Sequence, residues 1–74
     1  MTNTTNDPRM AHVIRARATA KAFHAIDVKY PLNKFRAEND AACQEVYAIL
    51  REEMTTPEAQ TEKLLALIGR IVAK

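Results

Sequence analysis

Three prolines divide this sequence of 74 residues into segments of helical length, and they constrain the fold more than any other feature. Asp7-Pro8 is typical of a helix start, because aspartate caps free N–H groups and proline fits the first helical position. Pro31 ends that helix, since the residue before a proline is disfavoured in the α region. Thr56-Pro57 marks another start, with Thr56 as the cap. The prolines therefore predict three successive helices.

The apolar residues between these prolines recur at spacings of three and four, which lines one face of a helix. We predict helices near residues 8–30, 33–54 and 57–73. Asn33 is the expected cap of the second helix, although its start could slip to Asn39. The apolar stripe of the first helix is Val13, Ala16, Ala20, Phe23, Ile26 and Tyr30. The stripe of the second is Phe35, Ala42, Val46, Ile49, Leu50 and Met54.

The third helix carries an apolar stripe about 160° wide, which is wider than packing against two short helices requires. Its members are Leu64, Leu65, Leu67, Ile68, Ile71 and Val72. The surplus face, broadened by Leu65 and Val72, indicates contact with a second copy or another chain. Gly69 within this helix marks either a close helix crossing or a frayed last turn. At its start, Thr55 and Glu58 could form a capping box in place of the Thr56 cap.

Length and composition predict one all-α domain at residues 7–74, preceded by a disordered tail at residues 1–6. The domain is either a small bundle or a helical hairpin with an extra helix. A chain this short buries a small core, and its single cysteine, Cys43, allows no internal disulfide. We therefore expect a homodimer in which Leu64, Leu65, Ile68, Ile71 and Val72 form the core or the dimer contact.

The chain is expected to lie in the cytoplasm, and no membrane partner is expected. A free thiol suits a reducing compartment. The first residues lack the basic and apolar regions of a signal peptide, and no apolar run approaches the roughly 20 residues that span a bilayer.

No group of residues predicts catalysis, so we do not expect an enzyme, a cofactor or a metal site. Cys43 has no histidine nearby in the sequence to act as its base and is better explained as a small apolar filler. His12 and His24 are separated by more than three helical turns, so they cannot share a metal within one chain.

The first helix is the most basic part of the chain. On a helical wheel, Arg17, Lys21 and His24 fall close together, with Met10 and Ile14 beside them on the side away from the predicted core. This pattern predicts a basic docking face with apolar anchors, whereas ordinary solubilising charge is the simpler alternative. Further candidate partner-binding residues near stripe edges are Arg15 and Tyr47, because arginine and tyrosine are favoured at interface hot spots.

Two classes of partner fit this basic face. A small helical DNA-binding regulator is the alternative to a protein-binding inhibitor or adaptor, because arginine and lysine neutralise phosphates. The Pro31-Leu32-Asn33 connection does not resemble the tight turn of a helix-turn-helix, and the first helix lacks the asparagine and glutamine that read bases. The sequence therefore favours a protein partner over nucleic acid.

Three segments also resemble a known family. They are the opening Thr-Asn-Thr-Thr-Asn-Asp-Pro-Arg, the Ala/Arg-rich stretch at 13–23 and the run Leu64-Leu-Ala-Leu-Ile. Together they are similar to the small helical quorum-sensing anti-activators of Pseudomonas phages, and the similarity covers most of the chain. The resemblance implies a helical homodimer in the host cytoplasm that binds a LuxR-type quorum-sensing transcription activator and blocks its action on DNA. It also implies contact with the pilus-assembly ATPase, and it assigns no role to any individual residue.

Overall fold

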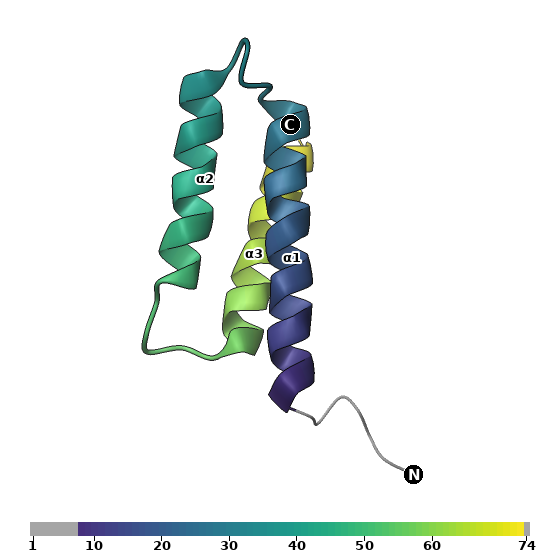
Figure 1. Cartoon of the computed structure of the whole chain (residues 1–74), viewed down its shortest axis with the longest axis vertical. Helices are drawn as coiled ribbons and strands as arrows, with labels where there is room; N and C mark the ends of the chain where they lie inside the picture. The colour runs from purple at the N-terminus through teal and green to yellow at the C-terminus, as the bar shows by residue number, and fades with distance from the viewer. Residues whose placement is uncertain (1–7, 74) are drawn as a thin grey trace.

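A computed structural model describes residues 8–73, and these residues form the three helices that the sequence predicts (Figure 1). The helices are α1 (Pro8–Lys29), α2 (Arg36–Leu50) and α3 (Pro57–Ala73). α1 and α3 lie side by side and run in the same direction (Figure 1). α2 runs in the opposite direction and connects the end of α1 to the start of α3. The predicted all-α class is confirmed. The predicted tail at residues 1–6 and the Asp7 cap lie outside the described residues.

The connections explain why α2 is shorter than predicted. The N–H groups of Lys34 and Phe35 both donate to the carbonyl of Pro31, at 3.0 and 2.7 Å, so residues 31–35 form a turn and α2 begins at Arg36 and not at Asn33. At the other end α2 stops at Leu50, and Met54 lies fully exposed in the connection. The predicted α3 start is confirmed, because Thr56 Oγ1 accepts the N–H of Ala59 at 3.1 Å.

The main core lies between α1 and α3, with a smaller contribution from α2. Its buried apolar side chains are Ala18, Ala22 and Ile26 of α1, Ala42 and Val46 of α2, and Leu64, Leu67 and Ile71 of α3. Alanines on α1 thus face leucine and isoleucine on α3. Small side chains allow the two helix axes to approach closely, and the larger side chains fill the space between them.

The predicted stripe of α1 is partly wrong. Val13, Ala16 and Ala20 are exposed, whereas Ile26 is buried and Phe23 is half-buried. The physical reason is that alanines occur all around α1, so the spacing of its few larger residues does not identify the face that packs. The buried face of α1 is determined by α3, which packs its large side chains against the alanine positions.

Two buried amides fix the position of α2. Asn39 Nδ2 donates to Asp27 Oδ1 at 3.0 Å and to the carbonyl of Tyr30 at 2.9 Å, near the first turn of α2. Gln60 Nε2 donates to the carbonyl of Ile49 at 2.9 Å, in the last turn of α2. The last carbonyls of a helix have no partner within the helix. The Ile49 carbonyl also accepts the N–H of Glu52 at 3.3 Å, so Gln60 adds a second, shorter bond that ties this end of α2 to α3. Both ends of α2 are therefore held by directional bonds.

Gly69 does not mark a close helix crossing. It is exposed, and a Cβ atom added there would meet nothing within 4 Å. The prediction of a close crossing is therefore wrong within the single chain, and α3 continues through Gly69 to Ala73.

Candidate functional site

Two hollows lie where α1 meets α3. The first encloses about 260 Å³ and is lined by Ile14, Arg17, Ala18, Lys21, Thr61 and Leu65. The second encloses about 430 Å³ and is lined by His24, Ala25, Val28, Lys29, Ile71 and Val72. We call these twelve residues the basic groove.

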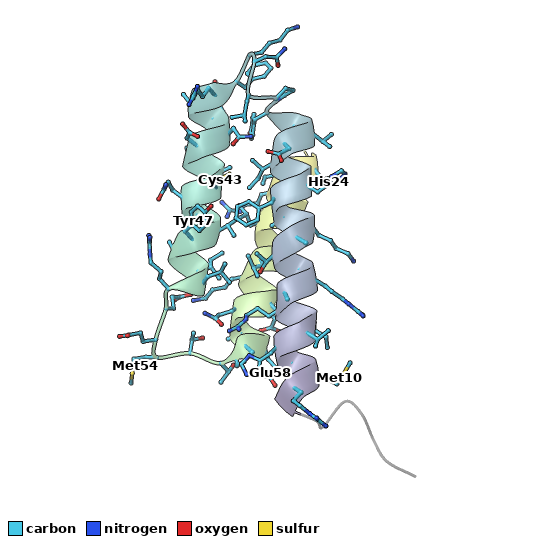
Figure 2. The ribbon with its side chains drawn as sticks, viewed as in Figure 1. Met10, His24, Cys43, Tyr47, Met54 and Glu58 are labelled. Carbon is cyan, nitrogen blue, oxygen red and sulfur yellow. The ribbon has the colours of Figure 1, made fainter. Side chains whose placement is uncertain are left out.

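The two hollows lie along one side of the α1–α3 pair. Val28 follows Ile14 by fourteen residues, which brings it back to within about 40° on the helix surface, and Val72 follows Leu65 to within about 20°. Phe23, which contacts Tyr47 of α2, lies about 180° from Ile14. The groove therefore faces away from α2. Met10 and His24 project from this same side of α1 (Figure 2).

The rim of the basic groove is apolar and accessible. The exposed fractions are 47% for Ile14 and 51% for Leu65 in the first hollow, and 67% for Val28 and 69% for Val72 in the second. Ala18 and Ile71 beneath them are buried. Isolated exposed apolar side chains are ordinary, but a contiguous set is typical of a binding surface.

The charged side chains that line the basic groove are the cations Arg17, Lys21 and Lys29. Among the described residues, no carboxylate forms a salt bridge with Arg17 or Lys21. The opposite side of α3 differs, because Lys63 pairs with Glu52 at 2.6 Å and Arg70 pairs with Glu45 at 3.4 Å. The positive charge of the groove is therefore available to a binding partner.

The structure brings most of the predicted partner-binding residues together and separates two of them. Met10, Ile14, Arg17, Lys21 and His24 share one face of α1. Arg15 points inward instead, where its Nη1 donates to Gln60 Oε1 at 2.8 Å. Tyr47 lies on α2 against Phe23, with ring centroids 5.5 Å apart, on the other side of α1.

The predicted core or dimer residues of α3 also divide into two sets. Leu64 and Ile71 are buried, and Ile68 is half-buried. Leu65 and Val72 are the exposed surplus of the stripe, and they line the basic groove. The predicted docking face of α1 and the predicted surplus face of α3 therefore form one continuous surface.

Five lining residues were not predicted from the sequence, namely Ala18, Ala25, Val28, Lys29 and Thr61. Val28 is the large apolar residue among them. It continues the alternating spacing of four and three that runs from Met10 through Ile14, Arg17, Lys21 and His24. This heptad-like spacing was a usable signal, because it keeps residues on one face of a helix. The signal was weak because Arg17, Lys21 and His24, in the middle of this spacing, are polar, so Val28 did not stand out as part of an apolar stripe.

Cys43 is half-buried, and its Sγ donates to Asn39 Oδ1 at 3.4 Å. Burial raises the pKa of the thiol, and the nearby carboxylates of Asp27 and Asp40 raise the pKa further. Because the thiolate is the nucleophilic form, these surroundings disfavour a reactive cysteine.

Within 8–73, no three histidine, cysteine, aspartate or glutamate side chains lie together as metal ligands would. None of the helices described is long and apolar enough to cross a membrane. Comparison of the chain with protein-family models, curated proteins and solved structures gave no significant match.

Proposed function

We propose that this chain is a small protein-binding inhibitor or adaptor, encoded by a phage, that binds and blocks a host regulatory protein. A quorum-sensing transcription activator of the LuxR type is the partner that the family resemblance favours. The observation that supports binding is the basic groove, where exposed apolar side chains of two helices surround cations that have no ion-pair partner within residues 8–73.

The apolar content of the groove favours a protein over nucleic acid. Phosphate contacts need only cations, whereas hot spots in protein interfaces combine buried apolar anchors with arginine. Ile14, Leu65, Val28 and Val72 supply such anchors on a scaffold whose α1–α3 core is well packed. A rigid scaffold reduces the entropy lost on binding.

Self-association is part of this proposal. Leu65 and Val72 provide an apolar contact for a second copy, as the sequence predicts. A symmetric pair through the groove would however bring equivalent cations of the two copies near one another, which opposes association. We therefore expect a weak homodimer that the host protein displaces. Sedimentation of the chain over a range of concentrations, alone and with the partner, measures both steps.

The deciding experiment uses the tagged chain to capture the host protein from a bacterial lysate. The lysate is treated with nuclease and kept at a salt concentration similar to that of the host cytoplasm. The captured protein is then purified, and its binding to its DNA site is measured with and without the chain. We expect a defined stoichiometric complex and loss of DNA binding by the regulator. An Arg17→Glu/Lys21→Glu variant should fold normally and lose about tenfold in affinity, because it reverses two charges of the groove.

A matched control is Lys34→Glu/Arg36→Glu, which makes the same change in net charge at exposed positions outside the groove. This control should bind the host protein as the unmodified chain does. Equal binding by all three proteins would place the surface elsewhere. Recovery of nucleic acid alone from an untreated lysate would favour the DNA-binding regulator instead.

A further inference from the structure

We propose that the basic groove receives one acidic amphipathic helix of the partner, with two apolar anchor residues at positions i and i+7. This inference rests on the proposed function and names the recognition element that the groove fits. Three observations support it: the spacing of the hollows, the parallel course of the two helices that form them, and the sign of the charge between them.

The spacing of the hollows fits a helix. Ala18 lies in the first hollow and Ala25 in the second, and Leu65 and Val72 form the corresponding walls on α3. Both pairs are seven residues apart, so the hollows repeat at about 10.5 Å along the groove. Residues i and i+7 of an incoming helix lie on one face at the same distance. Two anchors of one helix can therefore enter both hollows together.

Because α1 and α3 run in parallel, the seven-residue spacing on α1 and the seven-residue spacing on α3 advance in the same direction along the groove. Ile14 and Leu65 both line the first hollow, and Val28 and Val72 both line the second, so each hollow draws its walls from both helices. A third helix laid along two parallel helices buries its apolar face against both of them, as amphipathic helices do in hydrophobic grooves. The groove runs from Ile14 to Val28, or about 21 Å, which matches roughly four turns of the incoming helix.

The charge of the groove specifies an acidic occupant. Arg17 and Lys21 line the first hollow and Lys29 lines the second, and no carboxylate of the part of the chain described by the structure lines either one. The hollows on the other side of α3 each contain Glu45 as well as Arg70, so this excess of one sign belongs to the basic groove. Carboxylates placed between the two anchors of a partner helix would meet Arg17 and Lys21.

The same charge argues against a second copy of this chain as the high-affinity occupant. In a symmetric pair each surface meets its own equivalent, so Arg17 and Lys21 would approach cations of the other copy. Like charges at such an interface cost free energy, whereas an acidic helix gains it. The groove thus discriminates between the second copy and the acidic helix by charge.

The test is an unbiased selection of helical peptides on the immobilised full chain. The library displays alanine-rich peptides of about 18 residues, or roughly 27 Å, with one face randomised. We expect enriched peptides to carry apolar residues at i and i+7 with aspartate or glutamate between them. A selected peptide should bind Arg17→Glu/Lys21→Glu about tenfold more weakly and Lys34→Glu/Arg36→Glu unchanged.

A second variant tests the hollows apart from the charge. Leu65→Ser alters the wall of the first hollow at an exposed position, so the chain should keep its fold and still lose affinity for the selected peptide. Far-ultraviolet circular dichroism establishes that the variant is folded. Enriched peptides that are basic, or that lack the i, i+7 spacing, would overturn the proposal. So would tighter binding of a duplex DNA probe that the charge reversal abolishes.

The selection and the lysate experiment fail independently. If the selected peptides bind as expected but no host regulator is captured, the helix-binding groove stands and the proposed inhibitor function is wrong. If a host regulator binds while Arg17→Glu/Lys21→Glu and Leu65→Ser leave its affinity unchanged, the proposed function stands and this groove is not its site.

Discussion

The α1–α3 pair and the attachment of α2 are held by different kinds of interaction. Between α1 and α3, alanines pack against Leu64, Leu67 and Ile71 in an apolar contact. α2 contributes only Ala42 and Val46 to the buried core, and it is positioned by the buried amides of Asn39 and Gln60. Apolar packing is strong and non-directional, whereas hydrogen bonds contribute less free energy and fix orientation. The pair therefore supplies most of the stability, and the amides define where α2 lies.

The largest expected effect comes from the α1–α3 contact. Leu64→Ala should lower the free energy of unfolding by about 2–5 kcal/mol, because Leu64 is completely buried and its truncation leaves a cavity. Thermal or urea unfolding measures the loss. The neighbouring Leu65→Ala is the matched control, and it should change stability far less because Leu65 is half exposed. Equal losses from the two variants would contradict the placement of the core.

An intermediate effect is expected at the attachment of α2. Gln60→Ala removes the acceptor of Arg15 and the donor to the Ile49 carbonyl, so it should cost about 1–3 kcal/mol. Amide hydrogen exchange should accelerate most in the last turns of α2, since that end loses its directional bond. Gln44→Ala, at an exposed position of α2, provides the control. Uniform acceleration over all three helices would mean that Gln60 supports the whole core and not α2 in particular.

The smallest effect is expected from the ion pair between Glu45 of α2 and Arg70 of α3. Arg70→Ala removes the contact with Glu45, and both side chains are more than half exposed, at 65% and 52%. Such pairs contribute less than about 1 kcal/mol because water and salt screen them. Urea unfolding at low and high salt should show little change. A loss as large as that of Gln60→Ala would show that charge, and not the buried amides, holds α2.

The sequence predicted the helices well because their ends are encoded locally. Pro57 and the Thr56 cap act on their own neighbourhood, and the structure has α3 at the predicted residues. The start of α2 was less predictable, because the turn after Pro31 depends on bonds to a single carbonyl. The packing face of α1 depends on α3, and no local pattern in an alanine-rich helix reveals it.

The candidate site was predictable in part for the same reason. The cluster of Met10, Ile14, Arg17, Lys21 and His24 follows from helical spacing alone. Its union with Leu65 and Val72 depends on α1 and α3 lying in parallel, which is a property of the assembled fold. The inward course of Arg15 likewise depends on Gln60, a partner 45 residues away in the chain.

The separation of Arg15 and Gln60 by 45 residues affects how the chain folds during its synthesis. The two helices that bury most of the core are the first and the last of the three, and contacts such as Arg15 to Gln60 span 45 residues. Long-range contacts form slowly, because a long loop must close before they stabilise the chain. During translation, α1 and α2 emerge without the surface that completes their core. We therefore expect folding to begin only once α3 has left the ribosome, so an interrupted synthesis releases an unfolded chain.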